Sequence, residues 1–237
     1  MPERIDREGV RRLTGQGGQL VEVLPAADYA GDHLPGAISL PLRRLEREAT
    51  EVLDRDRPVI VYCWDSACDL SPRAARRLET LGFDKVYDYV EGKLDWLAAG
   101  LPTEGANAEK PRAVDLADRD VPTCDLDDRM GDVTRRAHAA GWDACVVVTA
   151  DRVVLGLLRS KELAAGPELR AEQAMRPGPS TFRPNVPIAE MAEYMTEHEL
   201  ESSPITSSDG RLIGLLRRSE AVRAAGRDDP GAADSPR

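Results

Sequence analysis

The N-terminal part of the chain alternates between short hydrophobic runs and stretches with hydrophobic residues at helical spacing. Unbroken runs of β-branched residues predict strands that are buried in a sheet. We expect strands at residues 20–24, 38–40, 59–62 and 85–90, and helices at 5–13, 45–53, 71–81 and 91–100. Strands that alternate with helices predict an α/β fold with a parallel sheet.

Cys63 directly follows the predicted strand Val59–Tyr62 and precedes a loop that leads into a helix. Ser71 as N-cap and Pro72 at the first helical position predict where this helix begins. The amides and dipole of a helix N-terminus lower the pKa of a nearby thiol and favour the thiolate. Cys63 is therefore a candidate nucleophile. The alternative is a small buried apolar residue, which free cysteines commonly are.

The C-terminal part of the chain contains an internal repeat. Val153–Arg159 aligns with Arg211–Arg217, and Gly156 aligns with Gly214, at an offset of 58 residues. Each copy predicts a helix (130–140; 188–198), a strand (144–149; 204–206), a second strand in the aligned run and a final helix. One such α+β unit cannot bury both faces of its sheet, so we expect the two copies to fold against each other.

Composition narrows the functional classes. The 237 residues are 41% hydrophobic and 31% charged, as is typical of a globular protein with one or two domains. The net charge of -10 argues against nucleic acid and against an anionic membrane as partners. No apolar run is as long as a membrane span, and the N-terminus lacks a signal-peptide core, so we expect a cytoplasmic protein. The spacing of the four Cys predicts no metal site.

Four motifs in the first half resemble a rhodanese domain: Tyr29 with His33-Leu34-Pro35-Gly36-Ala37-Ile38, then Val61-Tyr62-Cys63, then Gly82-Phe83, then Gly92, Trp96 and Gly100-Leu101-Pro102. The resemblance covers about residues 19–102. It implies a small α/β domain that transfers sulfane sulfur through a persulfide on Cys63, as a thiosulfate-type sulfurtransferase does. The implied partners are a small-molecule sulfur donor and a thiol acceptor. The loop whose amides would surround the sulfur comprises Trp64, Asp65, Ser66, Ala67, Cys68 and Asp69.

This loop departs from the usual family pattern. Cys68 stands where the family has an arginine, and Asp65 and Asp69 would each repel an anionic donor by about 1 kcal/mol. These departures favour a second interpretation, a binding module whose Cys63 is inactive. Cys63 and Cys68 could also form a disulfide or act as attacking and resolving thiols. A C-x5-R phosphatase is excluded, because Asp69 occupies the arginine position.

The repeat resembles a tandem pair of CBS domains, at about residues 113–167 and 171–225. In this family the cleft between copies often binds adenosine nucleotides, so AMP, ADP or ATP is a candidate regulatory ligand, while no cofactor is required. The candidate contacts are Pro204, Ile205, Arg159, Glu162, Arg217 and Glu220. The two arginines replace a usual hydroxyl residue, and could bind phosphates or pair with the two glutamates. A purely structural or dimerising pair is the alternative, and the family implies a homodimer.

The remaining segments are polar. We expect residues 1–18 to be an N-terminal extension, residues 103–112 a linker, and residues 226–237 a disordered tail. Two functions therefore remain open. One is a sulfurtransferase or sulfur carrier with a regulatory CBS pair, and the other is a non-enzymatic regulatory protein that uses both parts for binding.

Overall fold

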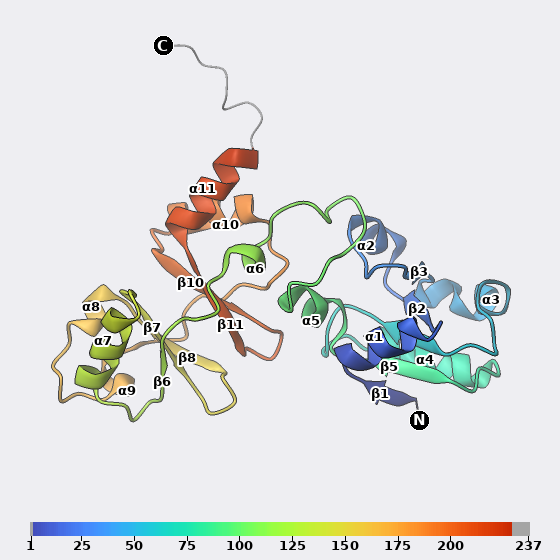
Figure 1. Ribbon diagram of the computed structural model, residues 1–237, viewed down its shortest axis with the longest axis horizontal. Helices are drawn as coiled ribbons and strands as arrows, with labels where there is room; N and C mark the ends of the chain where they lie inside the picture. The colour runs from blue at the N-terminus through green and yellow to red at the C-terminus, as the bar shows by residue number, and fades with distance from the viewer. Residues whose placement is uncertain (1, 229–237) are drawn as a thin grey trace, which may run out of the picture. The chain divides into compact units, whose positions relative to one another are not determined.

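The computed structural model describes residues 2–228. The chain divides into two compact units, and the boundary along the sequence lies between Lys110 and Pro111 (Figure 1). Each unit has its own hydrophobic core.

A five-stranded parallel sheet forms the centre of the first unit, in the order β1-β5-β4-β2-β3. The strands are β1 (Glu3–Ile5), β2 (Gln19–Glu22), β3 (Ile38–Ser39), β4 (Val59–Tyr62) and β5 (Val86–Tyr89). Every residue of β2 and β4 is buried, which explains the unbroken hydrophobic run of β4. The predicted parallel α/β fold is confirmed.

Helices cover both faces of this sheet. Val59 and Val61 face α3 (Leu42–Val52) and α4 (Leu70–Thr80). Ile60 and Tyr62 face the opposite layer, which contains residues of α1 (Arg7–Gly15) and α5 (Gly92–Ala98). Because side chains alternate along a strand, Cys63 continues the Val59 and Val61 series and enters the layer under α4.

Two segments outside the predicted domain belong to this unit. Residues 3–15, which we assigned to an extension, form β1 and α1, and β1 pairs with β5. In the expected linker, Glu104 and His33 exchange backbone hydrogen bonds, and the Asn107 amide donates to Gly31 O. A further helix, α2 (Ala26–Gly31), was not among the elements predicted from the sequence.

The second unit contains two copies of one motif, as the repeat predicted. The first copy contains α7 (Met130–Ala139), β7 (Cys145–Val148), β8 (Val154–Leu158) and α8 (Ser160–Leu163). The second contains α10 (Ile188–Glu197), β10 (Ser202–Thr206), β11 (Leu212–Arg217) and α11 (Arg218–Asp228). Both strand pairs are antiparallel and carry a bulge at the equivalent position, Val147/Val148 and Ile205/Thr206.

Each copy completes the sheet of the other. β9 (Arg176–Pro177), which precedes the second copy, pairs with β8 of the first. The equivalent residue before the first copy, Asp118, pairs with Leu215 in β11 of the second. The repeated glycines allow this approach, since a Cβ on Gly156 would lie 3.1 Å from Arg176 O, and one on Gly214 would lie 2.6 Å from Asp118 O. Three short elements complete the unit: α6 (Ala113–Leu116), β6 (Thr123–Cys124) and α9 (Ala171–Ala174).

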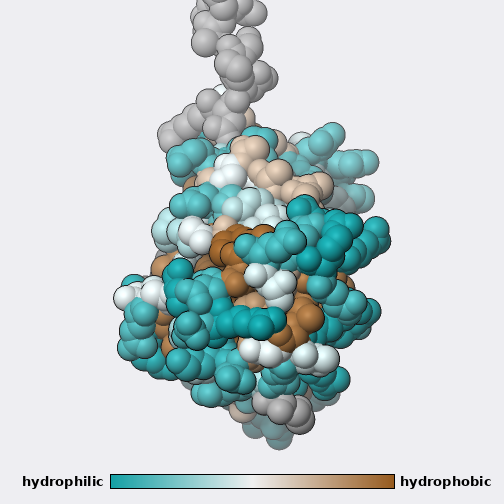
Figure 2. Space-filling model, turned by 90° about the vertical axis from the view of Figure 1, so that its right-hand side faces the viewer, coloured by the Kyte–Doolittle hydropathy of each residue, from teal (hydrophilic) through white to brown (hydrophobic). Residues whose placement is uncertain are grey.

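The visible surface is mostly hydrophilic, with smaller hydrophobic areas between the hydrophilic side chains (Figure 2). No helix in residues 2–228 is long and apolar enough to cross a membrane. α11 continues to Asp228, so the expected tail begins inside a helix. The rest of that predicted tail, residues 229–237, lies outside the described residues.

Candidate functional site

Cys63 lies at the carboxyl end of the central strand β4, with a fully buried side chain. Its Sγ is 3.4 Å from Ser71 Oγ and 3.5 Å from Cys68 O, so its single proton can be donated to either. Burial raises the pKa of the Cys63 thiol to about 12; Cys68 adds to this shift and Ser71 opposes it. The expectation that the helix N-terminus makes this thiol acidic is therefore wrong for this conformation, because desolvation of the charge dominates.

The helix after the loop begins at Leu70, earlier than the predicted start at Ser71. Asp69 is the N-cap residue, and its side chain forms no capping hydrogen bond. Ser71 therefore lies in the first turn of α4, only 1% exposed, and its hydroxyl faces Cys63 instead of capping the helix. The predicted N-cap is thus corrected to a contact with the thiol.

The loop between Cys63 and α4 bonds mainly to itself. The Ala67 amide donates to Asp65 Oδ1 at 3.0 Å, and the Cys68 amide donates to Asp65 O at 3.1 Å. Trp64 is half-buried, whereas Ser66 and Ala67 are exposed. Cys63 and Cys68 are both free thiols. In this conformation the amides of Ala67 and Cys68 donate to Asp65 within the loop, and neither is directed at the sulfur of Cys63.

The start of α5 fixes the backbone of the loop. The Lys93 amide donates to Cys63 O at 3.0 Å, and the Leu94 amide donates to Trp64 O at 2.9 Å. Gly92 makes this approach possible, because it has a φ of 63° and a Cβ there would lie 2.6 Å from Cys63 O. The position of the candidate nucleophile thus depends on β4, α4 and α5 together.

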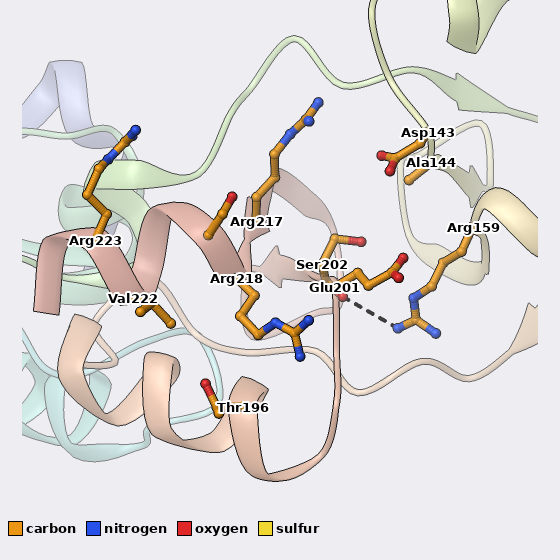
Figure 3. Close-up of a pocket in the computed structure, with 11 residues that line it drawn as sticks. Asp143, Ala144, Arg159, Thr196, Glu201, Ser202, Arg217, Arg218, Val222 and Arg223 are labelled. Carbon is orange, nitrogen blue, oxygen red and sulfur yellow. Dashed lines mark hydrogen bonds between the residues drawn. The ribbon is translucent and has the colours of Figure 1, made fainter. Parts of the chain in front are cut away.

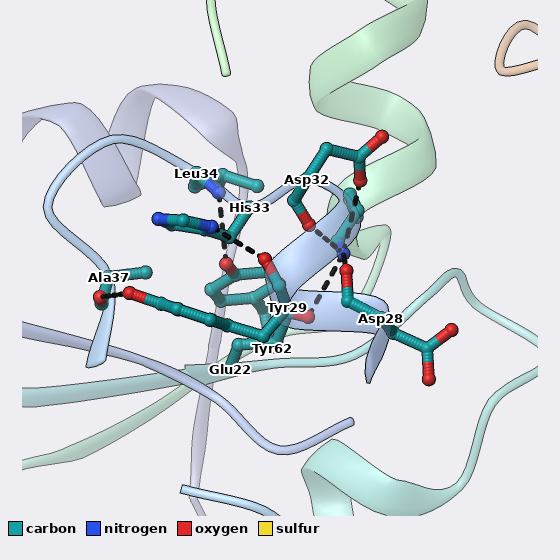
Figure 4. Close-up of polar contacts among 9 residues, drawn as sticks. Glu22, Asp28, Tyr29, Asp32, His33, Leu34, Ala37 and Tyr62 are labelled. Atoms are coloured by element: carbon teal, nitrogen blue, oxygen red, sulfur yellow. Dashed lines mark hydrogen bonds and ion pairs between the residues drawn. The ribbon is translucent and has the colours of Figure 1, made fainter. Parts of the chain in front are cut away.

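A buried ion-pair cluster supports the same region (Figure 4). Lys93 Nζ lies 2.9 Å from Glu22 Oε1 and 3.3 Å from Asp32 Oδ1, and neither Lys93 nor Glu22 has exposed side-chain surface. Nζ also lies 5.4 Å from the centre of the Trp64 ring. Burial raises the pKa of Glu22, although Lys93 opposes that shift. The nearby His33 ring stacks on Tyr29 at 3.7 Å.

The second unit contains a cavity of about 660 Å³ (Figure 3). Its lining comes from the residues just before β7, the residue after β8, the end of α10, the start of β10, the end of β11 and the first turns of α11. The charged side chains that line it are Arg159, Arg217, Arg218, Arg223, Asp143 and Glu201. Four guanidinium groups against two carboxylates make the lining positive, which favours an anionic ligand.

The two repeat arginines are held in different ways. Arg159 Nη2 donates to Ser202 O at 3.4 Å, while its buried Nε has no hydrogen-bond partner among the described residues. Burial and the nearby Arg176 lower the pKa of Arg159. The Arg217 guanidinium lies on the ring of Trp142, 3.7 Å from its centre. Both arginines line the same cavity.

The other predicted nucleotide contacts lie elsewhere. Glu162 caps α8 by accepting from the Arg159 amide, and its other oxygen accepts from Arg176 Nε at 2.7 Å. Pro204 and Ile205 are buried in β10 and do not line the cavity. Glu220 lies half-buried in the first turn of α11, also outside the lining. Sequence reasoning missed Thr196, Glu201 and Ser202, which do line it.

Residues 6–99 match the family of the rhodanese-like domain, and residues 171–227 match the CBS domain. The HTH-type transcriptional regulator Rv0324 of Mycobacterium tuberculosis is 37% identical over 100 residues, which are 42% of this chain and 43% of that protein. The thiosulfate sulfurtransferase GlpE of Coxiella burnetii is 32% identical over 88 residues, which are 37% of this chain and 78% of that protein. The chain belongs to the rhodanese-like family.

A CBS domain follows the rhodanese-like domain. A crystal structure of CBSX2 in complex with AMP is similar over 49% of this chain and 96% of that chain, at 18% identity and a TM-score of 0.45. The chain spans less than half of the length of Rv0324.

Within the rhodanese-like domain, three buried charged residues were missed from the sequence: Glu22, Asp88 and Lys93. Asp88 interrupts the hydrophobic run of β5, and Lys93 follows Gly92 at the start of α5. A charge inside an apolar run is the signal that could have identified Asp88. Among residues 2–228, no group of His, Cys, Asp and Glu could hold a metal ion.

Proposed function

We propose that the protein is a cytoplasmic sulfur carrier or sulfurtransferase in which Cys63 binds sulfane sulfur as a persulfide. The observation that carries this proposal is the place of Cys63, at the carboxyl end of β4 against the first turn of α4. Ligands of parallel sheets bind at this edge. The 32% identity of this domain to a thiosulfate sulfurtransferase supports the same chemistry.

The reaction has two steps. With thiosulfate as donor, the Cys63 thiolate attacks the outer sulfur, the S–S bond of the donor breaks, and sulfite leaves. A thiolate or cyanide acceptor then attacks the terminal sulfur of the persulfide and releases the Cys63 thiolate. Because Cys63 is fully buried, the loop from Trp64 to Asp69 must move before a donor can reach it.

A second candidate function is binding without catalysis. The burial of Cys63 and its pKa of about 12 favour this candidate, because a thiol in that state is a poor nucleophile at neutral pH. In this case the rhodanese-like domain would bind a protein partner, and the CBS pair would sense a ligand or dimerise the chain.

The formation of thiocyanate from thiosulfate and cyanide tests the first function. We expect the wild-type protein to form thiocyanate, and Cys63→Ser to reduce the rate to that of the uncatalysed reaction. Cys124→Ala, in the second unit, is the matched cysteine control and should retain the wild-type rate. Full activity in Cys63→Ser would exclude Cys63, and an inactive wild-type protein would favour the binding function.

For the CBS pair we propose an adenosine nucleotide as regulatory ligand. A volume of about 660 Å³ lies within the usual range of small-ligand pockets, roughly 300–1,000 Å³. The arginine-lined wall would bind the phosphates, with Arg159 and Arg217 as the principal contacts. We also propose that the chain forms a homodimer through this pair.

A further inference from the structure

Asp88 lies in the same buried layer as Cys63. Asp88 follows Val86 by two residues on β5, and Cys63 follows Val61 by two residues on β4. Val61 and Val86 belong to one hydrophobic cluster beneath α4, and Val61 pairs with Asp88 in the parallel register. Since alternate residues of a strand share a face, Asp88 and Cys63 both point toward the first turn of α4.

The Asp88 carboxylate is almost completely buried, at 2% exposure, and its Oδ1 has no hydrogen-bond partner among the described residues. The groups around it are the Ser71 hydroxyl on α4, Arg4 on β1 and Glu91 after β5. A buried carboxylate oxygen without a partner is costly, and such a cost is often retained where the group has a chemical task.

Ser71 connects the two residues. Its hydroxyl lies 3.4 Å from Cys63 Sγ, and the same side chain is close enough to Asp88 to lower the pKa of that carboxyl. A serine hydroxyl can accept one hydrogen bond and donate another at the same time. The Ser71 hydroxyl is therefore the group next to both the thiol and the carboxylate, and it can relay a proton from Cys63 to Asp88.

We propose that Asp88 removes the proton of the Cys63 thiol through the hydroxyl of Ser71. This inference rests on the proposed function, in which Cys63 is the nucleophile. The thiol proton moves to Ser71 Oγ as the hydroxyl proton moves to Asp88, which leaves a thiolate, an unchanged serine and a neutral carboxyl group. The thiolate then forms a bond to the outer sulfur of thiosulfate, and sulfite leaves with the electron pair of the broken S–S bond.

The electrostatics of the two groups suit this path. Burial raises the pKa of Asp88, Ser71 and Arg4 lower it, and Glu91 raises it, so that the net shift is upward. A raised pKa makes a carboxylate a stronger base, one that is still ionised above that pKa. The rate of Cys63 deprotonation should therefore increase as the pH rises through the pKa of Asp88. Cys63 needs such a base, because burial raises the pKa of its thiol to about 12.

The test is the rate at which iodoacetamide alkylates Cys63 in the full chain between pH 5 and 9, measured by mass spectrometry of the peptide that contains it. We expect Asp88→Asn and Ser71→Ala each to slow alkylation at pH 8 by roughly 10- to 100-fold. Asp88→Asn should also remove the increase in rate that follows Asp88 ionisation. Ser71→Thr keeps a hydroxyl and should restore most of the rate, and Asp84→Asn, an exposed aspartate in the same unit, should match the wild-type protein.

Opposite results would overturn the proposal. If Asp88 acts only as a neighbouring negative charge, Asp88→Asn lowers the thiol pKa, and alkylation becomes equal to or faster than in the wild type. A wild-type rate in Ser71→Ala would equally exclude the path, and this variant decides the test if Asp88→Asn does not fold. A parallel incubation of the wild-type protein with thiosulfate distinguishes a failure of the proposed function from a failure of the proton path. If alkylation follows the expected pattern while the wild-type protein gains no sulfur, the proposed function fails and the proton path stands.

Discussion

Gly92 combines a φ of 63° with a close contact, since an added Cβ would lie 2.6 Å from Cys63 O and 2.9 Å from the carbonyl carbon of Trp64. Gly82 has a φ of 87° but nothing within 4 Å of an added Cβ. A substitution at Gly82 would therefore introduce backbone strain alone, whereas one at Gly92 would introduce both strain and a steric clash. Only Gly92 touches the loop that carries the candidate nucleophile.

We predict that Gly82→Ala lowers the free energy of unfolding by about 1–2 kcal/mol, the usual strain of a left-handed residue. Gly92→Ala should lower it by more, because the methyl group must also displace the backbone of Cys63 and Trp64. Urea unfolding of both variants measures the difference. Equal losses in the two proteins would mean that the contact with Cys63 relaxes without cost.

At this scale the sequence predicted the position of Cys63 at the end of a strand, because that position depends only on the local run Val59–Tyr62. The sequence offered burial of the thiol only as the alternative to a reactive one, because that burial depends on Cys68 and Ser71 folding over it. The predicted effect of the helix N-terminus on the pKa was wrong for the same reason. A local sequence pattern indicates where a helix dipole will lie, but it does not indicate how far the Cys63 thiol will be removed from water.

Among the elements, α5 connects several parts of the first unit. Its Lys93 side chain joins β2 through Glu22 and the segment after α2 through Asp32, and its amides bond to the loop after β4. Lys93 and Glu22 are 71 residues apart in the chain, so no local pattern could predict this pair. The short strand β1 was missed for a related reason, since it is defined by its pairing with the distant strand β5 rather than by its own periodicity.

We predict that Lys93→Met lowers the free energy of unfolding by about 3–5 kcal/mol, because it leaves a carboxylate buried without its counter-charge. Lys85→Met is the matched control, since Lys85 is exposed and bonds only weakly to Asp56 O at 3.5 Å. Chemical denaturation compares the two variants. A loss in Lys93→Met no larger than in Lys85→Met would show that the buried cluster contributes nothing to stability.

At the scale of the whole molecule, the offset of 58 residues correctly predicted two copies of one motif. It did not predict that β9 and Asp118 exchange between the copies, because pairing across copies leaves no periodic signal in the sequence. The exchange means that neither copy has a complete sheet alone. The arginine-lined cavity depends on this arrangement, since it takes Arg159 from one copy and Arg217 from the other.

We predict that Arg159→Ala combined with Arg217→Ala weakens the binding of ATP by tenfold or more, because each arginine loses charge-assisted hydrogen bonds to phosphate. Isothermal titration calorimetry of the full chain measures the affinity. Arg135→Ala removes an arginine that is 75% exposed outside the cavity, and should bind as the wild type does. Unchanged affinity in the double variant would remove both residues from the phosphate site.

The central claim is that Cys63 carries a sulfane sulfur. The most direct measurement is the intact mass of the purified protein after incubation with thiosulfate, before and after treatment with a reductant. We predict a gain of one sulfur atom that the reductant removes and that Cys63→Ser lacks. A wild-type protein that gains no sulfur, while its Cys63 thiol can still be alkylated, would contradict this account.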